Sequence, residues 1–92
     1  MQVMFRYYAQ VRQAAGVESE QVQLPDGADL GAALSKAADL HGAAFRSLVL
    51  DAGGAIRPSL IILVNGQQTP LKGRAALADR DEVSIFTPIG GG

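Results

Sequence analysis

Apolar and polar residues alternate along residues 2–9, and this alternation predicts a strand with two different faces. One face carries Val3, Phe5 and Tyr7, and the other carries Met4, Arg6 and Tyr8. A second alternating stretch at residues 20–24 predicts another strand, so the two strands should form a hairpin with a wide connection. Residues 10–15 have helical propensity but are too few for a stable helix. We expect a loop or single turn there, closed by Gly16.

The next pattern is helical and covers residues 30–41. The sequence Pro25-Asp26-Gly27 predicts a turn before it, Asp29 is placed to cap its first amides, and Gly42 is placed to end it. One stripe of this helix recurs at intervals of three and four residues: Leu30, Ala33, Leu34, Ala37 and His41. Such a stripe predicts that the helix packs on a sheet.

The second half of the chain predicts further strands. Residues 43–50 favour a short turn, and the unbroken apolar run at residues 60–64 is typical of a strand buried on both faces near the middle of a sheet. Asn65-Gly66 is a strong hairpin signal, and residues 67–69 are expected to return as a brief edge strand. Residues 79–81 predict a turn into a final strand at residues 82–87.

Strands arranged around one helix in so short a chain predict an α+β fold. We expect a mixed sheet of four to five strands with one main helix packed on one face. The final strand should pair with the first. Residues 1–87 form the domain in this interpretation, and residues 88–92 form a flexible tail beyond it.

Composition agrees with a single globular domain. The chain has 92 residues, of which 48% are hydrophobic and 18% charged, with a net charge of −1. The basic residues are scattered, so we expect no nucleic acid and no membrane surface as partners. No apolar run is long enough to span a membrane, and the first residues do not follow the order of a secretory signal. These features predict a cytoplasmic protein.

Candidate chemistry is scarce in the body of the chain. There is no cysteine, which excludes disulfides, thiolate ligands and thiol nucleophiles. We find no paired general acid and base, no metal-binding cluster and no Ser/His/Asp arrangement, so no metal or cofactor is expected to bind. His41 is the single histidine, and at the end of a helix it is expected to lie over the last carbonyls.

The end of the chain is the exception. It reads Pro88-Ile89-Gly90-Gly91-Gly92, and glycines carry no side chain that would block entry into a narrow cleft. Fully extended, this stretch would reach roughly 15 to 18 Å, enough to place the carboxylate of Gly92 inside a partner's active site. The alternative is an ordinary small and floppy terminus.

Four short motifs in order resemble the MoaD/ThiS family of ubiquitin-like sulfur carriers. The first is Tyr8-Ala9-Gln10-Val11-Arg12 followed by Gly16, and the second is Val64-Asn65-Gly66. The third is Asp79-Arg80-Asp81-Glu82-Val83, in which Arg80 replaces the family's usual glycine and suggests a strained residue or another turn type. The fourth is the Pro88–Gly92 ending, where Thr87 replaces a proline common in the molybdopterin-synthase branch.

This resemblance implies a β-grasp fold and a specific chemistry at Gly92. An E1-like adenylyltransferase of the MoeB/ThiF type would adenylate the Gly92 carboxylate with ATP, and sulfur transfer would convert it to a thiocarboxylate. The chain would then be a sulfur-donating subunit without catalytic machinery of its own. Its leading acceptor is the molybdopterin synthase large subunit MoaE, in molybdenum cofactor biosynthesis.

Three other functions remain open from the sequence. The first is sulfur delivery to another acceptor, in cysteine, thiamin or tRNA thiolation pathways, and the second is conjugation of the activated tail to target lysines. The third is a β-grasp interaction module with an inert tail. For docking, Met4, Tyr8 and Phe86 share the outward phase of their strands and predict a partner-binding face, together with Pro88, Ile89, Gly90 and Gly91 of the tail.

Overall fold

A computed structural model of the chain describes residues 1–68 and 76–87. Five strands and three helices follow one another in this part: β1 (Gln2–Tyr7), α1 (Ala9–Ala15), β2 (Ser19–Gln23), α2 (Leu30–His41), α3 (Ala43–Val49), β3 (Ile61–Val64), β4 (Gln67–Gln68) and β5 (Glu82–Phe86). None of these helices is long and apolar enough to cross a membrane.

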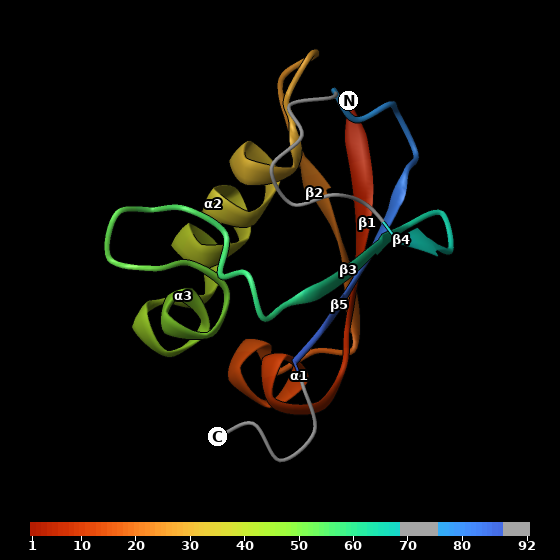
Figure 1. Ribbon diagram of the computed structural model, residues 1–92. Coiled ribbons are helices and arrows are strands. Elements are labelled where there is room, and N and C mark those ends of the chain that lie inside the picture. Colours follow the sequence, from red (N-terminus) through yellow and green to blue (C-terminus); the bar gives the residue numbers. More distant parts are fainter. Residues whose placement is uncertain (69–75, 88–92) are drawn as a thin grey trace.

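The strands form one mixed sheet in the order β2-β1-β5-β3-β4. β1 and β5 run parallel, whereas the other neighbouring strands are antiparallel. The pairing of the last strand with the first confirms the prediction from sequence, and it places β5 in the middle of the sheet. Figure 1 shows the strands crossing the molecule with the helices on one side.

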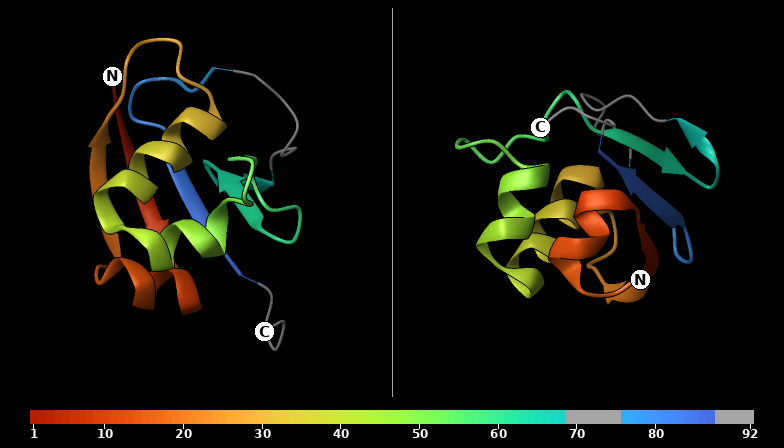
Figure 2. Two further views of the ribbon diagram at one scale, coloured as in Figure 1. Left: turned by 90° about the vertical axis from the view of Figure 1, so that its left-hand side faces the viewer. Right: turned by 90° about the horizontal axis from the view of Figure 1, so that it is seen from below.

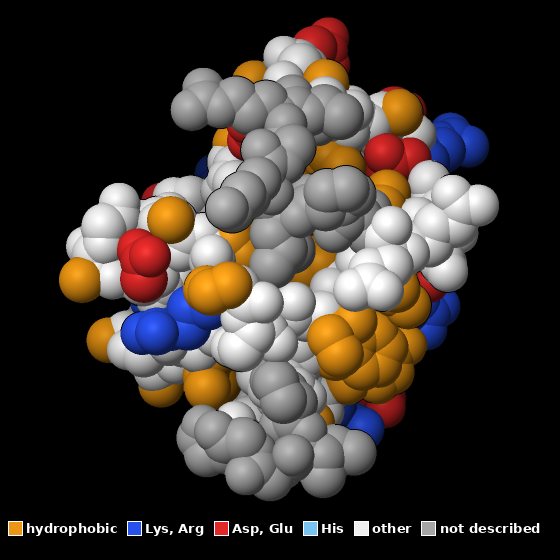
Figure 3. Space-filling view, in the orientation of Figure 1, with side chains coloured by type: hydrophobic (Ala, Val, Ile, Leu, Met, Phe, Trp, Pro, Cys, Tyr) orange, Lys and Arg blue, Asp and Glu red, His pale blue; other side chains and the backbone are white. Residues whose placement is uncertain are grey.

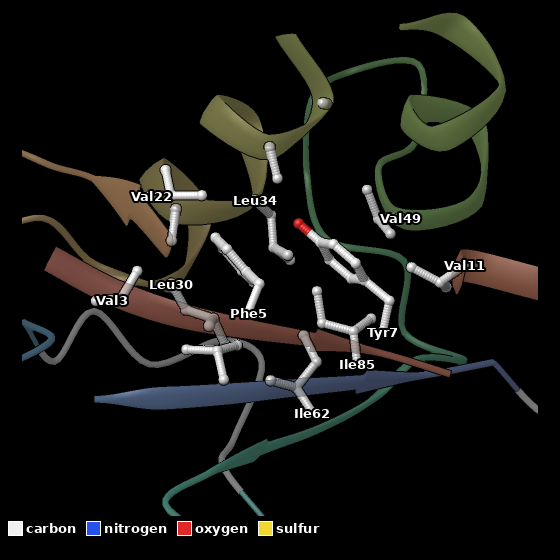
Figure 4. Close-up of a cluster of buried hydrophobic side chains, with 14 of the residues drawn as sticks. Val3, Phe5, Tyr7, Val11, Val22, Leu30, Leu34, Val49, Ile62 and Ile85 are labelled. Atoms are coloured by element: carbon white, nitrogen blue, oxygen red, sulfur yellow. The ribbon is translucent and has the colours of Figure 1, made fainter. Parts of the chain in front are cut away.

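The core lies between the sheet and the helices. α2 and α3 cover one face, and α1 closes the end of the sheet at which β5 finishes (Figure 2). Inward-facing side chains of the strands meet those of the helices in this layer, as Figure 4 shows for Phe5, Leu34 and Ile85, all three of which are fully buried. On the opposite face of the sheet, residues 1–68 and 76–87 place no helix.

Two helices stand where the sequence predicted only turns. α1 and α3 have seven residues each, too few to be stable alone. Both are held by the core, since Val11 of α1 and Phe45 and Val49 of α3 are completely buried. Gly16 does end α1, with φ 79°. Burial of a few apolar side chains therefore outweighs the weak helix preference of these stretches.

The prediction that residues 60–64 form a strand buried on both faces near the middle of the sheet is wrong. Ile62 is fully buried, but its neighbour Ile61 is 41% exposed. The central strand is β5, and β3 lies next to the two-residue edge strand β4. Because helices cover only one face of the sheet, alternate residues of an apolar strand must face outward.

The predicted turns and cap are confirmed. Asp29 Oδ1 accepts a hydrogen bond of 2.9 Å from the amide of Ala32 at the start of α2. Asn65 and Gly66 both have positive φ, 53° and 83°, as a two-residue hairpin of this kind requires. Arg80, which occupies the family's glycine position, has φ 70°, so the strain expected there is present.

Candidate functional site

The described part of the chain leaves the sheet at Thr87, directly after β5. The site predicted from sequence continues beyond this point, since Pro88, Ile89, Gly90, Gly91 and Gly92 lie outside the described residues. The described side of the site is therefore the end of β5 and the surface around it.

β5 is fixed along both of its sides. The register pairs Ile85 with Tyr7 of β1 and with Ile62 of β3, and all three side chains point into the core. One residue further along, the backbone N–H of Tyr8 donates to the carbonyl of Ile85 at 3.2 Å. β5 thus stays bonded to β1 up to Ile85 and stays paired with β3 up to Phe86.

The start of β5 is anchored by side chains. Asn65 donates from Nδ2 to Asp81 Oδ1 and accepts the amide of Glu82 at Oδ1, both at 2.9 Å. The second carboxylate oxygen of Asp81 accepts the amide of Ala78 at 2.8 Å. Asn65 and Asp81 both belong to the motifs noted in the sequence. Their hydrogen bonds fix the position at which β5 begins.

An apolar row crosses the outer face of the sheet where β5 ends. This terminal row is made up of Tyr8, which directly follows β1, Phe86 of β5 and Ile61 of β3. The rings of Tyr8 and Phe86 stack with centroids 4.3 Å apart and planes 7° from parallel. Tyr8 is 38% exposed and Ile61 41%, while Phe86 lies half-buried between them. Figure 3 shows a hydrophobic patch on this side of the molecule.

Polar contacts separate the terminal row from Met4. Arg6 lies between Met4 and Tyr8 on the same face, and its Nε pairs with Glu82 Oε1 at 2.9 Å. Ser84 lies beside this pair and is buried, with an exposed fraction of 7%. Of the three predicted docking residues, the structure therefore brings Tyr8 and Phe86 together, whereas the half-buried Met4 lies further along the same face.

Ile61 and the half-buried Leu63 also lie on this outer face, and neither was predicted as a site residue. The unbroken apolar run of β3 concealed them, because it suggested burial on both sides. A signal was available in the sequence. A chain with one main helix covers one face of its sheet, so such a run must present apolar side chains on the other face.

A polar cluster lies on the helix side of the sheet, away from the terminal row. Tyr7 donates from its hydroxyl to Glu20 Oε2 at 2.5 Å, and His41 Nε2 contacts the same oxygen. His41 therefore has a structural contact at the end of α2, but with the Glu20 carboxylate and not with the helix carbonyls that the sequence suggested. Burial, and then the hydrogen bond and negative charge of Glu20, raise the pKa of Tyr7.

Among residues 1–68 and 76–87 there is no group of three or more His, Asp or Glu side chains placed to hold a metal ion. The arrangement in this part of the chain is suited to presenting the end of β5 beside an exposed apolar surface.

Comparison with known proteins identifies the family. The model of the ThiS family matches residues 5–92. The chain belongs to the ThiS family. It is 37% identical to small archaeal modifier protein 3 of Haloferax volcanii and 30% identical to the molybdopterin synthase sulfur carrier subunit of Chlamydomonas reinhardtii, and each alignment covers both chains completely.

The β-grasp, ubiquitin-like fold expected for the ThiS family is confirmed. The crystal structure of SAMP1 from Haloferax volcanii superimposes with a TM-score of 0.88 at 27% identity, over the whole of both chains. The family resemblance drawn from the four motifs is thereby confirmed as well. The family comprises ubiquitin-like sulfur carriers and modifiers, which work with E1-like activating enzymes and acceptor enzymes.

Proposed function

We propose that this protein is a sulfur carrier that holds sulfur as a thiocarboxylate on Gly92. The observation that supports this most directly is the family match, which extends through Gly92. The relative from Chlamydomonas reinhardtii, aligned over its full length, is named a sulfur carrier subunit. The absence of cysteine from the sequence adds a chemical argument, since a carrier without a thiol must hold sulfur on another group.

The proposed chemistry has three balanced steps. The Gly92 carboxylate attacks the α-phosphate of ATP, which forms an acyl-adenylate and releases pyrophosphate. Hydrosulfide then adds to the acyl carbon, and AMP leaves with formation of the thiocarboxylate and release of a proton. Finally the sulfur attacks an electrophilic carbon of the acceptor and displaces a leaving group from it. Water then hydrolyses the acyl–sulfur bond, so that sulfur stays on the acceptor as a thiol, the carboxylate returns and a proton is released.

Both catalytic partners lie outside this chain in the proposal. An E1-like adenylyltransferase of the MoeB/ThiF type supplies the ATP site in the cytoplasm, and a sulfur-acceptor enzyme consumes the thiocarboxylate. We take the molybdopterin synthase large subunit MoaE as the acceptor, by analogy with the Chlamydomonas reinhardtii relative. Acceptors in cysteine, thiamin or tRNA thiolation pathways are the alternatives.

The outer face of the sheet is the proposed docking surface. It exposes Tyr8 and Ile61 beside Phe86, immediately before the segment that carries Gly92. Apolar side chains exposed together on a small domain are typical of an interface. Met4 extends the surface along β1, with the Arg6–Glu82 ion pair between it and the terminal row.

A second function is favoured by the 37% identity to small archaeal modifier protein 3. A lysine amine of a target protein can attack the same acyl-adenylate, and AMP then leaves with formation of an isopeptide bond. Both functions depend on the same activated glycine and differ in the nucleophile that follows.

The first test is mass analysis of the C-terminal peptide after incubation with ATP, sulfide and a MoeB-type adenylyltransferase. We expect the peptide ending in Gly92 to gain the mass difference between sulfur and oxygen, and to gain nothing when ATP is omitted. A variant lacking Gly91 and Gly92 should unfold like the wild type but should neither be adenylated nor restore molybdopterin synthesis in cells.

Two results would contradict the proposal. One is an unchanged C-terminal peptide with every activating enzyme of this type, and the other is normal sulfur delivery by the truncated variant. Recovery of the protein from cells on target lysines, with no thiocarboxylate form, would instead support the modifier.

A further inference from the structure

The corner at which β1 turns into α1 contains a strained residue next to the terminal row. Ala9 has φ 54°, a left-handed conformation that side chains other than glycine's seldom adopt. Along the described chain, the two other non-glycine residues with positive φ are Asn65 and Arg80, and both stand in turns. Ala9 differs from them because it is the first residue of a helix. Strain of this kind persists only where the surrounding structure imposes it.

The strained turn keeps Tyr8 in line with β1. Tyr8 remains extended, with φ −132° and ψ 152°, although α1 begins at the next residue. Its amide therefore still reaches the Ile85 carbonyl, and its ring still points to the outer face and stacks on Phe86. Without the abrupt change of direction at Ala9, the helix would begin to turn Tyr8 away from β5.

Phe86 is consequently held from two sides. The Tyr8 ring covers one side, and Ile61, its register partner on β3, lies on the other. Thr87 follows, half-buried, and its buried hydroxyl oxygen has no hydrogen-bond partner among the described residues. Phe86, the last residue of β5, is therefore fixed in place two residues before the Gly92-bearing segment begins at Pro88.

The position of this point matters for the activation step. Each residue released from the end of β5 would add roughly 3.3 Å of extended chain between the docked body and the reacting carboxylate. A longer flexible tether lowers the effective concentration of the group at its end. A displacement of about 1 Å at a reacting group can reduce the rate of reaction by about a hundredfold.

We propose that Tyr8 is a positioning residue for activation of Gly92: stacked on Phe86 through the strained turn at Ala9, it fixes where the sheet ends and the tail begins. This inference rests on the proposed function. It differs from the docking role, because docking concerns the strength of binding to a partner, whereas positioning concerns the rate within the bound complex.

The test measures adenylation with a MoeB-type adenylyltransferase while the concentration of this protein is varied. Tyr8→Leu removes the stack but keeps an apolar side chain, and Tyr8→Phe keeps the ring as the matched control. We expect the kcat of Tyr8→Leu to be about tenfold below that of Tyr8→Phe. Because Tyr8 also lies on the proposed docking surface, KM is expected to rise when its side chain is changed, and kcat is the readout of positioning.

Amide hydrogen exchange supplies a second measurement on the free protein. The amide at position 8 donates to Ile85, so its exchange should accelerate in Tyr8→Leu and remain slow in Tyr8→Phe. Urea unfolding of both variants checks that the body stays folded. If Tyr8→Leu proves unfolded, Phe86→Leu removes the other ring of the stack and allows the same comparison.

The outcomes separate this inference from the proposed function. A rise in KM with unchanged kcat, or wild-type kinetics in Tyr8→Leu, would overturn the positioning role while leaving sulfur carriage intact. Failure of the wild-type protein to be adenylated would overturn both.

Discussion

The hydroxyl of Tyr7 reaches the edge of the core, where it donates to the carboxylate of Glu20. The ring itself is 2% exposed and stacks with Phe5, while His41 and Phe45 meet it edge-on. This single side chain thereby joins two strands and two helices. Glu20 is a charged residue on the inward phase of the edge strand β2, a placement that discourages pairing of that edge with other chains.

Tyr7→Phe should lower the free energy of unfolding by about 1.5 kcal/mol at neutral pH, because the lost hydrogen bond goes to a charged group. The pKa of Tyr7 is raised in the folded state above the ordinary 10.0. Its contribution is therefore fully present below that pH and is lost as the pH rises above it. Urea unfolding at neutral pH and above pH 10.0 should show a smaller alkaline loss in Tyr7→Phe than in the wild type.

Tyr8→Phe is the control for this comparison, since it removes a hydroxyl from an exposed ring. It should keep the full alkaline loss of stability. An equal loss in Tyr7→Phe and wild type would show that the buried hydroxyl does not cause it.

At the scale of elements, sequence signals were most informative where a single residue type has a defined backbone role. Asp29 caps α2 and Asn65-Gly66 forms the hairpin turn, both as predicted. Gly16 closes residues 10–15 as expected, although these residues form a helix and not the predicted loop or single turn. The signals failed for α1 and α3, because their stability comes from buried contacts with distant residues, which local propensity does not contain.

The turn into β5 offers a direct test of backbone strain. Arg80 has φ 70° and a side chain that is 91% exposed, so its conformation and not its contacts should dominate its effect on stability. Arg80→Gly should increase the free energy of unfolding by up to about 1 kcal/mol, since relief of left-handed strain exceeds the added entropy of the unfolded chain. Urea unfolding measures the change.

Arg80→Ala is the matched control, because alanine removes the side chain but keeps the Cβ that causes the strain. It should bring no gain. Equal stabilisation by alanine and glycine would assign the effect to the arginine side chain instead.

At the scale of the whole molecule, the sheet has a helix-covered face and a face on which the described part of the chain places no helix. The alternation of β1 and β5 predicted this division, including the outward phase of Tyr8 and Phe86. It could not predict how Ile61 joins them, because that depends on β3 pairing with β5 in one particular register. The segment from Pro88 to Gly92 was predicted from composition and motif, and its role stays a proposal.

Ile61 and Ile62 are adjacent on β3 and face opposite sides, so they form a matched pair for testing the two faces. Ile62→Ala should lower the free energy of unfolding by about 2 to 5 kcal/mol through loss of core packing. Ile61→Ala should change it by less than about 1 kcal/mol but should raise KM for the MoeB-type adenylyltransferase. Urea unfolding and adenylation kinetics measure the two effects.

An unchanged KM in Ile61→Ala would remove Ile61 from the proposed docking surface. A small effect of Ile62→Ala on stability would contradict the core assigned to the helix-covered face.

The central place of β5 has a mechanical consequence. Traction applied at Thr87 acts along the axis of a strand that is bonded to β1 on one side and β3 on the other. The backbone hydrogen bonds to both neighbouring strands are then loaded together in shear. The hydrogen bonds of a strand peeled from a sheet edge break one after another instead. A partner that pulls on the end of this chain therefore loads a strand that resists extraction from the sheet. We expect the domain to stay folded under such a pull.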